Sequence, residues 1–198
     1  MRIHKFTWLL AACVLLGSIL EVHAQEQKPA RNSEESRLDI AVTYQAMLSN
    51  PVGSEARFWL QGGSVQLHGQ FWCGFGEVAD ISGEHTGQAR SGVGLDLVTA
   101  TFGPRYTWQK PHQPFSLYGQ ALVGEAFALN SVFPGPTAAT DSANSLALVF
   151  GGGVNYRLKH GFSLRALEAN WVRTQTPNNA SNVQNNLRLG AGLVLHIR

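Results

Sequence analysis

Strict alternation between apolar residues and small or polar ones is the feature that most constrains the fold of this chain. Every second residue is apolar from Leu38 to Leu48, and the same period returns from Leu187 to the last residue, Arg198. A period of two places successive side chains on opposite faces, which is typical of a β-strand. The first of these segments is about eleven residues long, which exceeds the usual length of a strand in a soluble protein.

Six further segments between these two have the same character, so that eight strands are predicted. They are expected at residues 57–68, 74–85, 93–108, 115–127, 144–156 and 162–173. In the last of these the alternation changes phase, which a β-bulge near Ala166 would explain. Pro104 cannot donate a backbone hydrogen bond, so its strand is expected to be kinked or bounded differently there. The predicted fold class is all-β, an eight-stranded antiparallel up-and-down barrel.

The connections between the expected strands alternate between tight and long. The second, fourth and sixth contain HGQFWC, QKPHQP and RLKHG, whereas the first, third, fifth and seventh contain NPVGSEA, TGQARSG, NSVFPGPTAATDSA and QTPNNASNVQ. In an up-and-down barrel, connections of the same parity lie at the same end. The long connections are therefore expected at one end only.

Aromatic residues concentrate in two places along the expected strands, one next to the tight connections and a thinner one towards the long connections. The first group is Phe71, Trp72, Phe75, Tyr106, Trp108, Phe115, Tyr118, Tyr156 and Phe162, and the second is Phe58, Trp59, Phe127 and Trp171. Amphipathic rings prefer the headgroup level of a bilayer. Two bands that bracket an apolar belt therefore indicate a barrel that spans a membrane.

Alternation by itself leaves open which face is wet, because a soluble lipocalin-type barrel has the same period with its polar face outside. Here the less apolar face has small residues and charges of both signs, namely Asp39, Arg165, Glu168 and Arg188. The strands carry few of the Lys and Glu residues that a soluble barrel displays. We therefore expect these charges inside a transmembrane barrel, where they neutralise one another and plug the interior. A proton or ion pathway is the alternative interpretation of the same charges.

The first two dozen residues have the pattern of an export signal. Basic residues precede an apolar run from Phe6 to Leu20, and small residues suited to cleavage follow it. Residues 1–24 are expected to be a signal peptide, residues 25–37 a flexible polar lead-in, and residues 38–198 the barrel domain.

Two alternatives for this segment are an uncleaved membrane anchor and a lipoprotein signal at Cys13. The apolar run of about fifteen residues is short for a membrane span, and it continues past Cys13, where a lipoprotein cysteine would close it. Once Cys13 is removed, Cys73 is the only cysteine left, which excludes a structural disulfide. Cys73 is expected to be a small packed side chain near a turn, because no neighbouring His or Lys would activate its thiol.

The net charge, the mean hydropathy and the number of cysteines exclude several classes of protein. The 198 residues carry a formal net charge of +2 and only 14% are charged, which argues against a nucleic-acid-binding protein. A mean hydropathy of −0.08 is far from that of a polytopic helical membrane protein. Two cysteines are too few for a four-cysteine zinc site. A β-rich secreted or envelope protein remains.

Several local runs resemble a known family. TFGPRYTW, SLYGQALVGEAF, SLALVFGGGVNYRL and the closing NVQNNLRLGAGLVLHIR, together with the signal and the amphipathic strands, are similar to the small bacterial outer-membrane β-barrel proteins related to the transmembrane domain of outer-membrane protein A. The resemblance covers about residues 38–198. It implies localisation in the outer membrane, contact with outer-membrane lipid, and insertion by the barrel-assembly machinery.

The end of the chain departs from this family's pattern. The final strand of the family usually ends in an aromatic residue, whereas this chain ends Ile197-Arg198, which bears on the efficiency of insertion. We expect no peptidoglycan-binding domain of the kind that larger relatives carry after the barrel. Anchoring to the cell wall is therefore not implied.

An enzyme is the main alternative to a structural role. Lipid A deacylases among the small barrels use a His-x-Ser pair on a strand, and no histidine here has a serine two places later. The G-x-S-x-G and G-x-G-x-x-G motifs are absent as well. Glu84 and His85 are expected to be a surface-facing pair. The other histidines of the expected barrel, which lack metal-ligand spacing on any one strand, are His68, His112, His160 and His196.

We therefore expect a non-enzymatic outer-membrane barrel with a structural or surface-interaction role and no catalytic, cofactor-binding or metal-binding residues. The alternatives are a lipid-modifying barrel enzyme and a soluble periplasmic barrel that binds an apolar ligand inside. What the long connections contact is left open.

Overall fold

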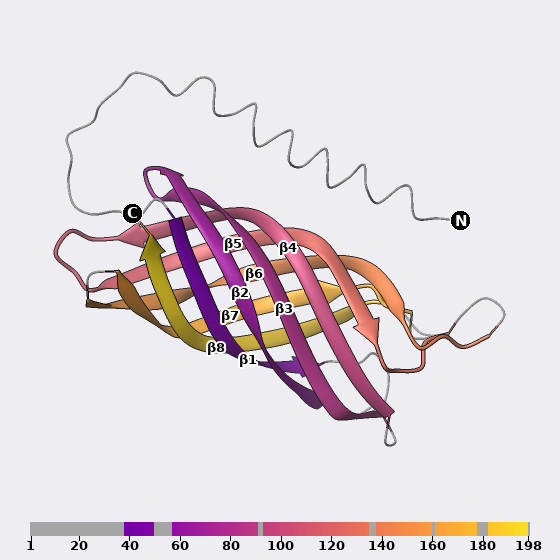
Figure 1. Ribbon diagram of the computed structural model, residues 1–198. Helices are drawn as coiled ribbons and strands as arrows, with labels where there is room; N and C mark the ends of the chain where they lie inside the picture. Colours follow the sequence, from indigo (N-terminus) through magenta and orange to yellow (C-terminus); the bar gives the residue numbers. More distant parts are fainter. Residues whose placement is uncertain are drawn as a thin grey trace. The chain divides into compact units, whose positions relative to one another are not determined.

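The barrel is a single antiparallel sheet that closes on itself. The computed structural model describes residues 38–49, 57–90, 93–134, 138–159, 161–177 and 182–197. Its strands are β1 (Leu38–Ser49), β2 (Phe58–Trp72), β3 (Phe75–Arg90), β4 (Val93–Gln109), β5 (Phe115–Leu129), β6 (Ala143–Lys159), β7 (Phe162–Thr174) and β8 (Gln184–Ile197). Each strand pairs with the next, and β8 pairs with β1 (Figure 1). The predicted fold class is confirmed.

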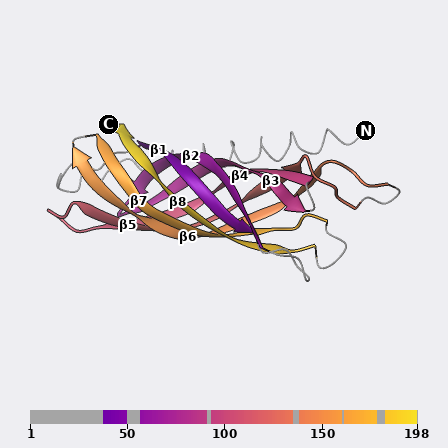
Figure 2. The ribbon, with the colours of Figure 1, turned by 90° about the horizontal axis from the view of Figure 1, so that it is seen from below.

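Strand order gives the barrel two different ends. The connections β2–β3, β4–β5 and β6–β7 lie at the end where β1 begins and β8 finishes, since Leu38 is paired with Ile197. We call this the short-turn end and the opposite one the long-connection end. The strands run obliquely between the two ends (Figure 2). In the described part of the chain, no helix is long and apolar enough to cross a membrane.

The third connection differs from its prediction. The run TGQARSG was expected to be a long loop, but β3 continues to Arg90 and pairs there with Val93, and residues 91–92 lie outside the described residues. The expectation of a long third connection is therefore wrong. The run has polar residues on both faces, and this pattern indicates a loop when only the sequence is considered. In the structure the strand continues through a register shift after Thr86, and Arg90 pairs with β4 again.

Ala166 and Pro104, the two positions at which the sequence predicts an irregular strand, differ in how they are paired. Ala166 has no partner in either neighbouring strand, because the register of β7 shifts between Arg165 and Glu168, so the predicted bulge is confirmed. Pro104 lies within a continuous β4 and is paired with Glu77 of β3, whereas the pairing of β4 with β5 skips it. The strand is therefore correctly bounded, and the missing proline N–H coincides with a local break in one ladder.

The alternation divides the wall of the barrel into an inner and an outer face, as predicted. In β1, Gln45 is fully buried, whereas its neighbour Tyr44 is 62% exposed. In β8, Val194 is 1% exposed and Leu193 is 54% exposed. The apolar positions of the alternation therefore face outward, and the small and polar ones face inward.

The first tight turn contains Cys73 and Gly74, both with positive φ values of 42° and 88°. Such a two-residue turn matches the twist of its flanking strands. Cys73 is exposed at this turn, so the expectation that its side chain is packed is wrong. Cys13 and residues 1–37 lie outside the described residues, as do His160 and Arg198.

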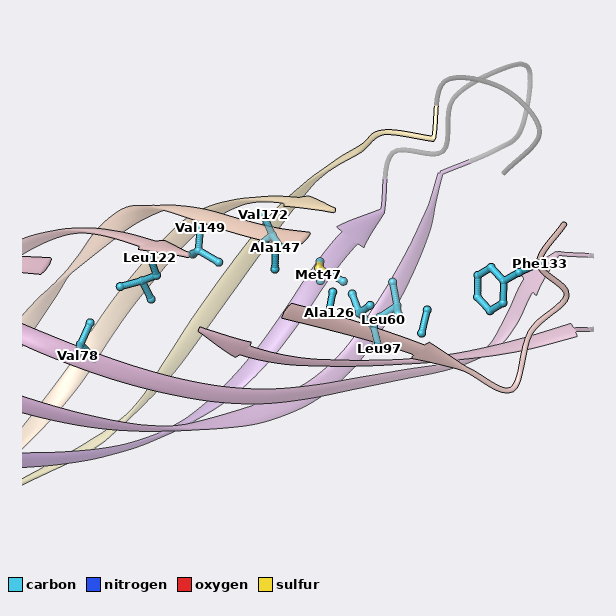
Figure 3. Close-up of a cluster of buried hydrophobic side chains, with 11 residues drawn as sticks. Met47, Leu60, Val78, Leu97, Leu122, Ala126, Phe133, Ala147, Val149 and Val172 are labelled. Carbon is cyan, nitrogen blue, oxygen red and sulfur yellow. The ribbon is translucent and has the colours of Figure 1, made fainter. Parts of the chain in front are cut away.

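An apolar cluster fills part of the interior, mostly towards the long-connection end (Figure 3). Phe133 belongs to it although it lies in the β5–β6 connection, where it forms an isolated bridge with Thr140. That connection therefore places an aromatic ring over the barrel interior. The other members of the cluster are Met47, Leu60, Val78, Leu97, Leu122, Ala126, Ala128, Ala147, Val149 and Val172.

The inward-facing glycine Gly192 allows β8 to approach β1 closely. A Cβ atom at this position would lie 2.0 Å from the backbone oxygen of Val42. Gly83 of β3 is a matched contrast, because a Cβ atom there would meet no atom within 4 Å. A side chain at Gly192 must therefore displace backbone at the strand pair that closes the barrel.

We expect Gly192→Ala to destabilise the folded barrel by about 1–3 kcal/mol, the usual cost of overpacking. Urea unfolding of the refolded protein, followed by tryptophan fluorescence, measures this loss. Gly83→Ala is the control and should change stability by less than about 0.5 kcal/mol. Equal effects of the two substitutions would contradict the close approach of β1 and β8.

Candidate functional site

The outer wall of the barrel is a continuous apolar surface. Large hydrophobic side chains that are well exposed occur on every strand, whereas soluble monomers rarely expose such a wide patch. They include Val42, Val65, Ile81, Phe102, Leu117, Val123, Phe150, Leu167 and Leu193. A wall of this kind has to be covered by an apolar phase.

Aromatic side chains lie on the outer wall near both ends, with four exceptions to the predicted grouping. Near the short-turn end the exposed rings are Phe71, Trp72, Phe75, Tyr106, Trp108, Phe115 and Phe162, and towards the other end they are Trp59 and Trp171. Tyr118 is 6% exposed and lies inside the barrel, and Phe58 packs against the interior cluster. Phe127 and Tyr156 face outward but are only half-exposed. Tyr118 and Phe58 were grouped by position along the chain, but strand parity places them on the inner face.

A network of buried polar side chains crosses the barrel interior around Glu168. One carboxylate oxygen of Glu168 accepts from Arg165 Nη1 at 2.5 Å and from the Tyr118 hydroxyl at 2.9 Å. The other accepts from Gln66 Nε2 at 2.9 Å and from Asn170 Nδ2 at 2.6 Å. These partners come from β2, β5 and β7. We call this set, together with Arg105 and Gln120, the central network.

Two guanidinium groups hold the ring of Tyr118 in the central network. The central carbon of the Arg105 guanidinium lies 4.3 Å from the ring centroid, and that of Arg165 lies 4.9 Å from it. Gln66 Oε1 accepts from both arginines at 2.6 Å. Cation–π contact and hydrogen bonds together offset the cost of burying two like charges.

A second buried group surrounds Arg188 of β8. Its guanidinium donates to Ser82 at 2.7 Å and lies 3.2 Å from Asp80 and 3.4 Å from Glu84. Asp80 and Glu84 both lie on β3, so the contacts join strands that are far apart in the sequence. With this group and the central network, the expectation that Arg165, Glu168 and Arg188 face inward is confirmed.

Glu84 and His85 do not form a surface-facing pair. Glu84 is buried against Arg188, whereas the His85 side chain is 68% exposed and contacts Asp96 on the outer wall. Asp96 also accepts a hydrogen bond from Asn130. Adjacent residues of a strand point to opposite faces, so the two side chains lie on opposite sides of the wall.

A chain of side-chain contacts inside the short-turn end joins four residues, namely Ser163, His196, Asp39 and His68. Ser163 Oγ lies 2.7 Å from His196 Nε2, and His196 Nδ1 lies 2.7 Å from one oxygen of Asp39. His68 Nδ1 lies 3.3 Å from the other oxygen of Asp39. The register explains the convergence, because Asp39 pairs with His196 across one side of β1 and with His68 across the other.

The sequence analysis missed this chain of contacts because the contacting residues are 29 or more positions apart. One sequence signal could have found it. Once β8 is paired with β1, all four residues lie near the same end of the barrel at positions whose side chains point inward. His112 lies in the β4–β5 turn, with a φ of 63°, and is exposed. Among the described residues, no group of three or more His, Cys, Asp or Glu side chains could hold a metal ion.

Comparison with solved structures identifies barrels of the same architecture. Neisserial surface protein A is 14% identical, with a TM-score of 0.62 over 82% of this chain and 98% of that chain. Ail, the attachment invasion locus protein of Yersinia pestis, is 17% identical, with a TM-score of 0.51 over 82% of this chain and 100% of that chain. The fold is that of the small eight-stranded outer-membrane barrels. No protein-family model and no curated protein sequence matches the chain.

We expect Glu168→Gln to destabilise the barrel by about 3–5 kcal/mol, because it leaves the buried Arg165 guanidinium without its charged partner. Urea unfolding in lipid vesicles measures this loss. Glu77→Gln is the matched control, since Glu77 lies exposed on the outer face with no ion pair to a described residue. It should change stability by less than about 0.5 kcal/mol. A loss in Glu168→Gln no greater than in the control would show that the central network contributes little.

Proposed function

We propose that this protein is a bacterial outer-membrane β-barrel with a structural or surface-interaction role that requires no catalysis. The observation that carries the proposal is the division of the wall, with exposed apolar side chains outside and buried ion pairs inside. In lipid, a sheet must pair all its backbone groups, and a closed eight-stranded barrel does so. The names of the two matched proteins, a surface protein and an attachment protein, accord with such a role.

The proposal includes a route to the membrane and an orientation. Residues 1–24 serve as a signal peptide, the polar residues 25–37 lead into the barrel, and the barrel-assembly machinery inserts residues 38–198. Short turns face the periplasm in such barrels and longer connections face outward. The connections β1–β2, β5–β6 and β7–β8 would then meet partners outside the cell.

We propose further that the interior is plugged. Arg165 and Arg188 are among the largest fully buried side chains, and each contacts a buried carboxylate. Eight strands enclose a space that side chains just fill. The protein is therefore expected to form no wide pore.

The two alternative functions lack comparable support. A soluble ligand-binding barrel needs a polar outer wall and an apolar cavity, which is the reverse of the arrangement around the central network. A lipid-modifying enzyme needs a nucleophile and a base on a surface that lipid can reach. On the outer wall of the described barrel, the His85 and Asp96 contact has no serine or cysteine in its bonded group.

Electrophoresis of the envelope fraction, unboiled and boiled, tests the proposal. Closed membrane barrels resist detergent, so the unboiled protein should migrate faster than the boiled one and should remain in the outer-membrane fraction. Protein in the soluble periplasmic fraction without a boiling-dependent shift would favour the soluble ligand-binding barrel.

We expect Leu193→Arg to oppose membrane insertion by about 2–4 kcal/mol if this exposed position lies near the middle of the bilayer. The comparison of folding yields in lipid vesicles at several urea concentrations measures the effect. Leu193→Ala removes apolar area without adding a charge and is the control. Insertion of the arginine variant as efficient as that of the parent would show that Leu193 does not face lipid.

A further inference from the structure

The contacts of Ser163, His196 and Asp39 have the order of a nucleophile, a base and an orienting carboxylate. An ionised Asp39 can only accept, so His196 carries its proton on Nδ1 and donates it to Asp39 over 2.7 Å. The lone pair of His196 Nε2 is then available to accept from the Ser163 hydroxyl over 2.7 Å. This is the arrangement by which a neutral serine hydroxyl becomes nucleophilic.

The same arrangement is absent from two other serines of the interior. Ser64 contacts the hydroxyl of Thr43, and Ser82 contacts the hydroxyl of Thr99. Ser64 also accepts from Gln45 Nε2 over 3.0 Å and Ser82 from Arg188 Nη1 over 2.7 Å, and among the described contacts neither serine meets an imidazole. Ser163 instead lies against an imidazole whose far nitrogen is held by a carboxylate, which a purely space-filling role does not require.

The histidine and carboxylate that accompany Ser163 are partly exposed, and a cation lies on the neighbouring strand. The side chains of His196 and Asp39 are 24% and 21% exposed at the short-turn end, whereas Ser163 is 4% exposed. Arg157 is the cross-strand partner of Ser163, so its side chain leaves the same face of the sheet, and it is exposed. A guanidinium on the strand next to the nucleophile can stabilise a developing oxyanion or attract an anionic group when it reaches the bound ester.

Asp39 is supported on its second oxygen as well. His68 is buried and its Nδ1 lies 3.3 Å from that oxygen, while its Nε2 has no hydrogen-bond partner. A second N–H donor keeps the carboxylate fixed while it orients His196. We therefore treat His68 as a positioning residue.

We propose that Ser163, His196 and Asp39 hydrolyse short-chain carboxylic esters that enter the barrel mouth at the short-turn end. Arg157, on the strand beside Ser163, favours an ester that carries a negative charge. This activity goes beyond the structural role proposed above. If it is present, the expectation of a non-enzymatic protein is wrong.

The reaction balances without a metal or a redox partner. Ser163 Oγ bonds to the ester carbonyl carbon while His196 Nε2 takes the hydroxyl proton, and the C–O bond to the alcohol then breaks as His196 returns the proton to the leaving oxygen. Water attacks the acyl-serine, and His196 takes a proton from it and returns that proton to Ser163 Oγ. The net change is ester and water to acid and alcohol.

The test uses the refolded full barrel in detergent, with its fold checked by boiling-dependent migration. Diisopropyl fluorophosphate should form a Ser163 Oγ–phosphorus bond with loss of fluoride, and peptide mass spectrometry locates the adduct. H196Q should slow this labelling by about 100-fold, the usual contribution of a general base. S64A removes an interior serine that has no base and should label at Ser163 as fast as the parent.

Hydrolysis supplies the second measurement. The protein should cleave 4-acetoxybenzoate faster than phenyl acetate, S163A should abolish both activities, and R157A should lose the preference between them. No adduct at Ser163 on a folded barrel, or labelling equally fast in H196Q, would overturn the proposal. Membrane insertion of S163A distinguishes this outcome from failure of the structural role, because the inactive variant should still insert and still shift on boiling.

Discussion

Closure of one sheet by the pairing of β8 with β1 is the constraint on which the rest of this structure depends. A strand in lipid has no water to satisfy its backbone groups, so an open edge would leave a row of unpaired N–H and C=O groups. The β1–β8 ladder removes that edge along almost the whole length of β1, from Leu38 to Leu48. Gly192 lets the two strands approach closely at this seam. Without this pairing of β1 with β8, neither the inner nor the outer face of the sheet would have a fixed environment.

Closure also creates the polar interior. Gln66 and Glu168 are 102 positions apart, and Arg188 and Asp80 are 108 positions apart, yet each pair is in contact. These groups lie away from water, where a charge is stable only with a partner and hydrogen bonds. The same partners that neutralise the charges also fix which strands face each other across the barrel. The central network and the Arg188 group therefore depend on the seam and also stabilise the closed arrangement.

The two ends of the barrel differ in chemistry for the same reason. The long-connection end holds most of the apolar cluster, with Phe133 supplied by a connection. The short-turn end brings the first residues of β1 beside the last residues of β8, which places Asp39 between His196 and His68. The chain of contacts that carries the proposed ester hydrolysis thus exists only because the barrel closes at this end.

The sequence alone determined where most of the strands lie, how β1 and β8 divide into two faces, and where β7 bulges, because a period of two is a local property of the chain. It did not determine which strand continues past a polar run, as the β3–β4 hairpin shows. Tyr118 and Phe58 were grouped by position along the chain and Glu84 was paired with its neighbour His85, and both interpretations ignored the strand parity that places these residues inside. The partners of Ser163, Asp39 and Glu168 were decided only by the tertiary structure. Contacts between distant strands depend on register and closure, and these are fixed by hydrogen bonds across the whole sheet.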